Sequence, residues 1–327
     1  MNYKKAFLKF SAFGLACFYV FGTALAADWP GGQAIKLIVP ASAGSAPDVA
    51  SRKVALFLAE RLKQAVVVDD KPGASGSIAM QALAASRPDG YTLGYGNIAT
   101  LAINPNLFSK LPYDSGRDFT PVIALTSIPN VLVVREGLPA DSLQSLVAYA
   151  KANPGRLTMA SAGIGTTSHL CGELLKKEAG ISYLHIPYQN ASQGVSDLMG
   201  GNIDFMIENL SAVLGAIQSG KVRALAITSK TRSAVLPGVP TMEESGAPGF
   251  EVVAWGGFMV PAGVPRRIIE RLNRELNEFV ALPASKKEFA QFAATLIGGT
   301  SEEFATLIVE ESRRWGDIIR KNDIKPD

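Results

Sequence analysis

The stretch Leu157-Thr-Met-Ala-Ser-Ala-Gly-Ile-Gly-Thr-Thr-Ser-His169 joins an apolar strand, a loop of small residues and the start of a helix. It predicts a strand over Leu157–Ala160 and a helix from His169 to about Ala179. A helix N-terminus presents unpaired N–H groups and the positive end of the helix dipole, and small residues let a ligand approach them. The stretch therefore predicts an anion-binding loop at the edge of an open α/β sheet.

The same strand–loop–helix pattern recurs on both sides of this stretch. Two further small-residue loops, 42–48 and 73–77, follow predicted strands and open helices. This alternation favours a mostly parallel sheet flanked by helices. The other expected strands are Ile35–Val39, Ala65–Val68, Tyr91–Tyr95, Val131–Val134, Tyr183–Ile186, Ile203–Ile207, Leu225–Ile227 and Val252–Val260. The other main helices are expected at 49–62, Leu143–Ala150, Ser192–Met199, Arg266–Ala281 and Ser301–Ile319.

The pattern restarts near residue 131, and the chain is longer than a single hydrophobic core usually supports. We therefore expect two α/β lobes, lobe 1 from residues 27–125 plus 250–327 and lobe 2 from 126–249. The chain should cross between them near Pro121–Ser127 and Phe250–Pro261. No Gly/Ser-rich linker marks either crossing, which favours lobes joined by strands over independent domains.

The first 26 residues have the features of an export signal. Three lysines precede an uncharged apolar run over Phe10–Phe21, and Ala24-Leu-Ala26 supplies a small-x-small cleavage pattern. We expect cleavage near Ala26 and a periplasmic mature protein. A membrane anchor is the alternative, but the apolar run is shorter than a bilayer span. A lipoprotein site at Cys17 is a second alternative, with the leucine one place too close.

Removing this segment changes the charge balance of the chain. The full sequence has 32 Lys+Arg and 29 Asp+Glu, and residues 1–26 contain three lysines and no acidic residue. The mature chain would carry 29 residues of each sign. Nothing in this balance suggests nucleic acid or an anionic membrane as a partner. Cys171 would be the single remaining cysteine, so no internal disulfide is expected.

Sequence signatures of enzymes are absent. A nucleophile elbow would need glycine where Met159 stands, and no P-loop or complete dinucleotide fingerprint occurs. His169 and Cys171, two apart on a helix, point to different faces and suit no common metal ion. His185 is interpreted as a structural histidine. We expect no enzyme, no metal and no cofactor.

The 161–168 loop is the strongest candidate for ligand binding, because Ser161, Thr166, Thr167 and Ser168 add hydroxyl groups to the backbone donors. A well-capped helix without a ligand explains the same composition equally well. The 42–48 loop is weaker, since Pro47 has no N–H and Asp48 is most simply a helix cap.

Motifs along the whole mature chain are similar to those of the Bug-type solute-binding proteins of tripartite tricarboxylate transporters from Gram-negative bacteria. They cover essentially all of residues 28–327 and are specific in combination. They are Trp29-Pro30, Lys36-Leu-Ile-Val-Pro40, Lys71-Pro-Gly-Ala74, Pro88-Asp-Gly-Tyr-Thr92, Asn104-Pro105, Ser161-x-Gly163-x-Gly165 with His169-Leu170, His185-Ile-Pro-Tyr188, Gly220-Lys-Val-Arg-Ala-Leu-Ala226, Val239-Pro-Thr241 and Pro261-Ala-Gly-Val-Pro265.

The resemblance implies a two-lobed, type II periplasmic-binding fold with the ligand cleft between the lobes. It implies capture of a small carboxylate and delivery to a two-subunit inner-membrane permease, without an enzymatic step. Such a protein is expected to be a monomer. Carried onto matching positions, the ligand-binding candidates are Gly44, Ser45, Ser161, Gly163, Gly165, Thr166, His169 and Tyr188, with Asn97 and Thr100 as weaker candidates.

Departures from the family pattern bear on the ligand. Asn190 stands where the family usually has glycine, and Glu208 where it often has aspartate. If Glu208 faces the cleft, it would repel a second carboxylate and accept a hydrogen bond from a ligand hydroxyl, amine or amide. That favours a monocarboxylate or an amino-acid-like ligand over a tricarboxylate. A position on the rim, or pairing with a cation, is the equal alternative.

Two other function classes remain open on the sequence alone. A ligand sensor that presents a metabolite to a membrane receptor would have the same fold and pocket. A periplasmic hydrolase or isomerase is disfavoured, because no nucleophile–base pair is found by motif.

Overall fold

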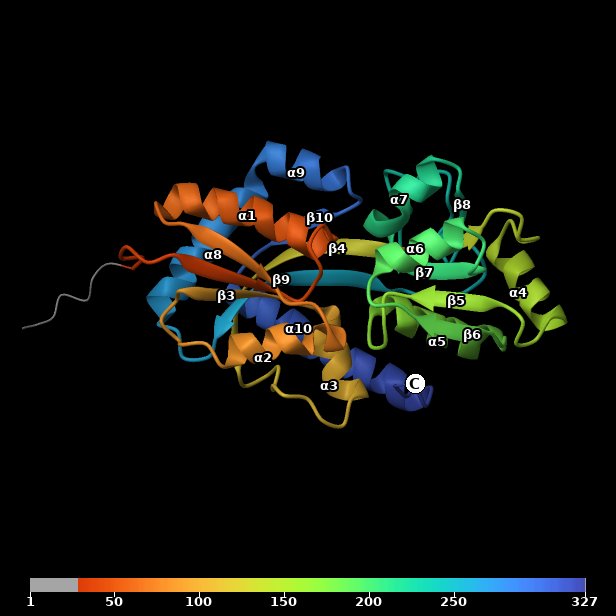
Figure 1. Ribbon diagram of the computed structural model, residues 1–327, viewed down its shortest axis with the longest axis horizontal. Helices are drawn as coiled ribbons and strands as arrows, with labels where there is room; N and C mark the ends of the chain where they lie inside the picture. Colours follow the sequence, from red (N-terminus) through yellow and green to blue (C-terminus); the bar gives the residue numbers. More distant parts are fainter. Residues whose placement is uncertain (1–28, 327) are drawn as a thin grey trace, which may run out of the picture.

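The computed structural model describes residues 29–326, so the expected signal peptide, with its cleavage near Ala26, lies outside the described residues (Figure 1). The strands in chain order are β1 (Ile35–Val39), β2 (Val66–Asp70), β3 (Thr92–Asn97), β4 (Phe119–Arg135), β5 (Thr158–Ser161), β6 (Leu184–Pro187), β7 (Phe205–Asn209), β8 (Val222–Ile227), β9 (Val253–Pro261) and β10 (Thr295–Gly298).

The main helices are α1 (Ala46–Leu62), α2 (Ser77–Ala84), α3 (Asn104–Leu107), α4 (Leu143–Ala152), α5 (Thr167–Ala179), α6 (Ala191–Met199), α7 (Leu210–Gln218), α8 (Arg266–Ala281), α9 (Pro283–Ala290) and α10 (Ser301–Lys321). A short 3₁₀ turn covers Ala74–Gly76, and a π-helical segment covers Ala99–Ile103. Every strand and helix that the strand–loop–helix alternation predicts is present, with ends shifted by a few residues.

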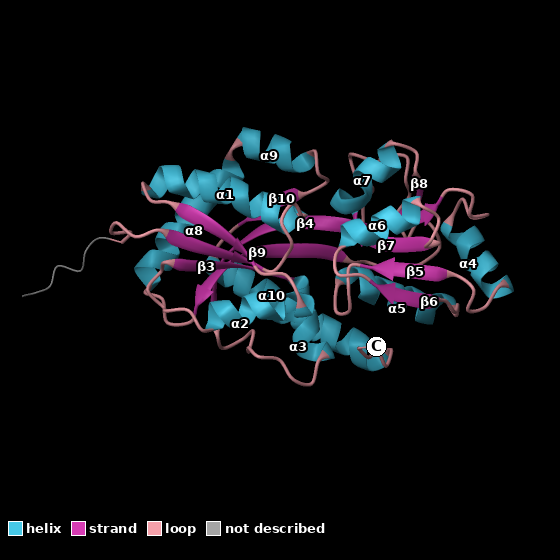
Figure 2. Ribbon diagram, viewed as in Figure 1, coloured by secondary structure: helices cyan, strands magenta, loops and turns pink. Residues whose placement is uncertain are grey.

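The strands follow the order β2-β1-β3-β9-β4-β7-β5-β6, with β8 and β10 also paired to β4. Strands β1, β2 and β3 are parallel, as are β5, β6 and β7, whereas β4 and β9 run antiparallel to their neighbours. The predicted mostly parallel sheet with flanking helices is therefore confirmed, with antiparallel crossing strands at its centre. Figure 2 shows helices on both sides of the strands.

The 17-residue strand β4 connects the two lobes (Figure 1). Its pairing with β9 ends at Pro129, opposite Val253, and its pairing with β7 begins at Asn130, opposite Asn209. We call β1–β3, β9, β10 and the first part of β4 lobe 1, and β5–β8 with the rest of β4 lobe 2. The partner change lies a few residues beyond the predicted crossing at Pro121–Ser127.

Sequence reasoning expected a strand at Val131–Val134 and a separate crossing near Pro121–Ser127, whereas β4 is one continuous strand through both. Pro121 and Pro129 are both inside it. The register shifts between Pro121 and Ile123, as expected for a bulge that accommodates a residue without an N–H donor.

Each lobe has its own buried apolar residues. One cluster packs α1 and α8 against β1 and β9, with Leu37, Leu58 and Leu272 fully buried. Another packs α6 and α7 against β4 and β7, with Met206 and Val213 fully buried. A third cluster extends through both lobes. Within residues 29–326, no helix is both long and apolar enough to cross a bilayer.

Candidate ligand-binding site

The loop 161–166 leads from β5 into α5 and is held by its own hydrogen bonds. Thr166 is the N-cap of α5: its hydroxyl accepts from the His169 N–H at 3.3 Å and donates to the Gly163 carbonyl at 2.6 Å. The Gly163 N–H donates to Ser161 Oγ at 3.2 Å, and the Gly165 N–H to His169 Nδ1 at 3.3 Å. The glycine N–H groups predicted to face a ligand are thus used within the loop.

The donors left for a ligand lie one turn further along. The N–H groups of Thr167 and Ser168, in the first turn of α5, have no acceptor among the described residues. Both side chains are buried. The sequence predicted the correct loop, but the structure moves the available donors from the glycines to the start of the helix.

Ser161 lies beside a stacked pair of histidines, His169 and His185. The rings of His169 and His185 lie 4.8 Å apart with planes 25° apart. Ser161 Oγ lies 2.7 Å from His185 Nε2. The structural interpretation of His185 is supported, because it holds the end of β5. This Ser–His contact joins two strands 24 residues apart, so no local motif could have revealed it.

The first predicted loop is also self-contained. Gly44 adopts φ +79°, and its N–H donates to Asp48 Oδ2 at 2.7 Å. Asp48 is 2% exposed and pairs with Arg52 at 2.7 Å. The prediction that Asp48 is the helix cap is wrong: Ser45 occupies the N-cap position, and Asp48 reaches back from the first turn to hold Gly44. The Ser45 hydroxyl is buried without a hydrogen-bond partner among the described residues.

The two candidates after β3 bond mainly to each other. The Thr100 N–H donates to Asn97 Oδ1 at 3.0 Å, and the Asn97 N–H donates to Thr100 Oγ1 at 3.1 Å. Thr100 is 1% exposed. These bonds shape the turn into the π-helical segment. Direct contact of either residue with a ligand stays a prediction.

The two lobes touch where the small-residue loops meet. Ser75 Oγ donates to the Ile164 carbonyl at 2.5 Å, and Asn104 Nδ2 donates to the Ser75 carbonyl at 2.9 Å. A Cβ on Gly165 would lie 2.5 Å from Asn104 Oδ1 and 3.1 Å from the Phe108 ring. Sequence reasoning missed Ser75 and Asn104, although it noted the 73–77 loop, because their role appears only when the lobes are together.

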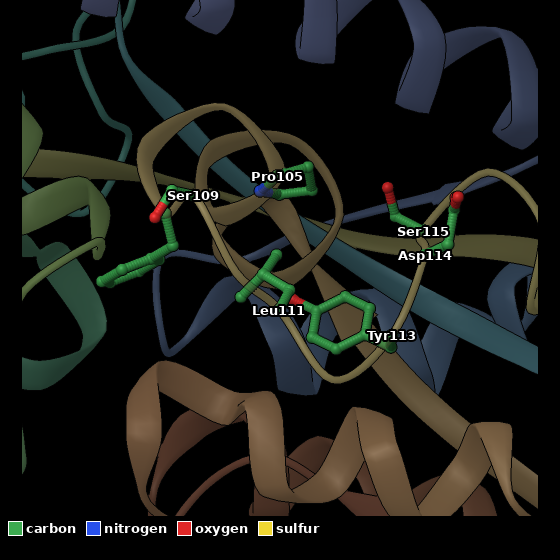
Figure 3. A pocket seen from close by; sticks show the side chains of 7 residues that line it. Pro105, Ser109, Leu111, Tyr113, Asp114 and Ser115 are labelled. Atoms are coloured by element: carbon green, nitrogen blue, oxygen red, sulfur yellow. The ribbon is translucent and has the colours of Figure 1, made fainter.

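A hollow of about 270 Å³ adjoins this contact on lobe 1 (Figure 3). Phe108, which faces Gly165, is part of its wall. The remaining lining residues are Pro105, Ser109, Leu111, Tyr113, Asp114 and Ser115. None of the predicted site residues lines it, so the hollow is beside the loops and not between them.

Tyr188 and Asn190 follow β6, and their hydrogen bonds are to other residues of lobe 2. The Tyr188 N–H donates to the Ser161 carbonyl at 2.9 Å, and its hydroxyl donates to Asp197 Oδ2 at 2.6 Å. Burial, with the Asp197 carboxylate, raises the pKa of Tyr188 to about 12. Asn190 is the N-cap of α6, and its Oδ1 accepts from the Gln193 N–H at 3.1 Å. The side-chain oxygen of Asn190 therefore caps α6. Contact of Tyr188 or Asn190 with a ligand stays a prediction.

Glu208 ends β7 in the interior of lobe 2. Its side chain is 1% exposed, so the alternative that placed it on the rim is wrong. Oε1 accepts from the Asn209 N–H at 2.8 Å. Burial raises the pKa of Glu208 to about 7, against the opposing effects of Asn209, Ser168 and the Ala162 N–H. Ser168 and Ala162 favour the ionised form, but neither meets hydrogen-bond geometry with Oε2.

The described residues were compared with the needs of a metal site and of a reactive thiol. Within residues 29–326 no three His, Cys, Asp or Glu side chains are grouped to hold a metal ion. Cys171 is fully buried, and burial raises the pKa of its thiol. A buried, protonated thiol is a poor nucleophile.

Comparison with known proteins shows relatives over most of the chain. Residues 50–324 match the model of the tripartite tricarboxylate transporter family receptor. Protein BugT of Bordetella pertussis is 38% identical over 302 residues, covering 92% of this chain and 93% of BugT. The family resemblance drawn from the motifs is thereby confirmed.

Solved structures agree with the fold. Rpa4515 of R. palustris with adipate has a TM-score of 0.88 at 32% identity, covering 92% of this chain and all of that one. Periplasmic binding protein BugD has a TM-score of 0.84 at 30% identity (90% and 99% covered). MatC of Rhodopseudomonas palustris with bound malate has a TM-score of 0.82 at 30% identity (88% and 98% covered). The predicted two-lobed binding-protein fold is confirmed.

Proposed function

Because the chain belongs to the tripartite tricarboxylate transporter receptor family, we propose that it is a periplasmic solute-binding protein that captures a small carboxylate for transport. The observation that carries this proposal is the start of α5. The N–H groups of the buried residues Thr167 and Ser168 have no acceptor among the described residues and lie at the positive end of a 13-residue helix. The related structures with adipate and malate support a carboxylate as the ligand class.

We propose that lobes close on the ligand about β4 and the start of β9. The boundaries between the lobes are expected near 125/126 and 249/250. The first is close to the point at which β4 changes its partner strand from β9 to β7, between Pro129 and Asn130. The Thr228 hydroxyl links the two crossing segments at the same point, because it accepts from the Asn130 N–H and donates to the Val252 carbonyl. The Ser75–Ile164 bond supports closure with the small-residue loops in contact.

The expected partner is a two-subunit inner-membrane permease, and the expected location is the periplasm after cleavage near Ala26. Family membership and the likeness to periplasmic binding protein BugD support both. We propose a monomer. A sensor that presents the ligand to a membrane receptor is the alternative, and co-purification of the protein with each kind of membrane partner distinguishes them.

One observation favours a second candidate, a hydrolase. Ser161 and His185 form a nucleophile–base distance of 2.7 Å. However, Ser161 is fully buried and its oxygen also accepts from Gly163, so the hydroxyl braces the loop. Incubation with the tightest ligand, followed by mass spectrometry, should return that ligand unchanged; a converted product would establish the hydrolase instead.

A thermal-shift screen tests the ligand class. A ligand at a hundredfold excess over its Kd stabilises the folded state by about 2.7 kcal/mol. We expect at least one mono-, di- or tricarboxylate, aromatic acid or amino acid to raise Tm by several degrees, while neutral sugars and amines do not. If only neutral solutes raise Tm, the anion site at α5 is wrong.

Thr166 links the cap to binding. Thr166→Ala removes the bonds to the His169 N–H and the Gly163 carbonyl, so we expect about 1 kcal/mol less stability and an affinity weaker by about 0.5–3 kcal/mol. Thr166→Ser keeps the hydroxyl and should retain both. Urea unfolding and calorimetric titration measure the two effects. Wild-type affinity in Thr166→Ala would place the ligand elsewhere.

A further inference from the structure

Buried polar atoms without hydrogen-bond partners occur on neighbouring segments at one edge of lobe 2. Among the described residues they include Asn130 Oδ1, Ser168 Oγ, Glu208 Oε2, Asn209 Oδ1 and Ser211 Oγ. Asn130, Ser168 and Glu208 are at most 1% exposed. Buried polar groups are nearly always paired, so the unpaired Glu208 Oε2 and Ser168 Oγ indicate a missing partner.

The topology places these residues on adjacent segments, with Asn130 and Asn209 on one face of the sheet and Glu208 on the other. Asn130 on β4 is the register partner of Asn209 on β7, and Val131 is that of Glu208. Helix α7 begins at Leu210, so Ser211 lies in its first turn. Ser168, in the first turn of α5, is near enough to Glu208 to lower its pKa. These residues therefore lie near the carboxyl end of β7, beside the start of α5, where the Thr167 and Ser168 N–H groups have no acceptor.

The Ser168 and Ser211 hydroxyls can donate to a ligand carboxylate, but the other three unpaired oxygens need a partner that donates hydrogen bonds. An ionised Glu208 oxygen only accepts, and the two amide oxygens also only accept. A bare carboxylate ligand has no hydrogen to give and would face Glu208 with the same charge. A hydroxyl or ammonium group would satisfy Oε2, and charge-assisted bonds of this kind are the stronger ones.

We infer that Glu208 determines ligand specificity by accepting a hydrogen bond from a hydroxyl or ammonium group on the carbon next to the ligand carboxylate. The inference rests on the proposed function, because it needs the carboxylate at Thr167 and Ser168. Ser168 belongs to that helix start and also lies beside Glu208, so the two ligand groups must be close together. The ligand class is therefore a 2-hydroxy or 2-amino acid.

The test is a calorimetric titration with two matched series at pH 8. Propanoate, lactate and alanine share a three-carbon chain with one carboxylate; succinate, malate and aspartate share a four-carbon chain with two. In at least one series we expect the donor-bearing acids to bind at least tenfold more tightly than the donor-free acid. Glu208→Gln should weaken the amino acid at least tenfold, and Glu208→Ala should remove the preference.

Glu243→Gln is the matched control, since Glu243 is an exposed glutamate of lobe 2. It should leave every affinity unchanged. The inference is overturned if donor-free acids, adipate included, bind best, or if Glu208→Gln weakens donor-free and donor-bearing acids equally. Either result keeps the proposed function. If no carboxylate of the thermal screen binds, the proposed function fails as well.

Discussion

Replacing Glu208 by glutamine is expected to stabilise the unliganded protein by about 3 kcal/mol at pH 8 and to have little effect at pH 4. Burial raises the pKa of Glu208 to about 7 from an ordinary value of 4.5. Each pKa unit corresponds to about 1.4 kcal/mol of free energy. Glutamine has the same shape, carries no charge to desolvate, and can still accept from the Asn209 N–H.

The direction with pH follows from proton binding. Between pH 4.5 and 7 the folded protein keeps the Glu208 proton and the unfolded chain has lost it, so the stability of the wild type falls as pH rises. Below pH 4.5 both states are protonated and the penalty is absent. Above pH 7 both are ionised and the penalty is complete. The difference in unfolding free energy between Glu208→Gln and the wild type should therefore grow as the pH rises from 4.5 to 7.

Urea unfolding at pH 4, 6 and 8 measures this gap. Glu243→Gln, at an exposed position, should show almost none at any pH. A wild type that is as stable as Glu208→Gln at pH 8 would mean that the buried carboxylate is compensated in the folded state. A residue that destabilises the empty protein yet occupies the site is typical of one retained for its ligand.

Much of the fold could be predicted because its strands and helices carry local signals. The 157–169 stretch shows a strand, a small-residue loop and a helix within 13 residues, and the structure has all three. The π-helical segment Ala99–Ile103 and strand β10 were missed. Both are only four or five residues long and owe their form to the elements packed beside them. Short segments without periodicity carry little information about structure.

The site was predictable at the level of loops and not of atoms. The glycines of 161–168 did identify the loop, but which N–H groups remain open depends on His169 Nδ1 and Ser161 Oγ. Those acceptors are positioned by tertiary packing, including the contact of Ser161 with His185. Burial of Glu208 also required the fold, since a glutamate at a strand end is usually exposed.

Gly165→Ala is expected to weaken ligand binding by about 10- to 100-fold, which corresponds to about 1.4–2.8 kcal/mol. The added Cβ would lie 2.5 Å from Asn104 Oδ1. Asn104 cannot withdraw cheaply, because its Nδ2 donates to the Ser75 carbonyl and Ser75 in turn donates to Ile164. The lobes would therefore meet a steric obstacle where their loops now touch.

Gly180→Ala separates this obstacle from backbone strain. Gly180 ends α5 with φ +62°, close to the +78° of Gly165, and a Cβ there would meet no atom within 4 Å. Both variants place alanine in the left-handed region, which costs about 1–2 kcal/mol of stability. Calorimetric titration with the best acid of the screen should show a weakened Gly165→Ala and an unchanged Gly180→Ala. Equal losses would assign the effect to strain in α5, and wild-type affinity in both would mean that the lobes stay apart at Gly165 when ligand is bound.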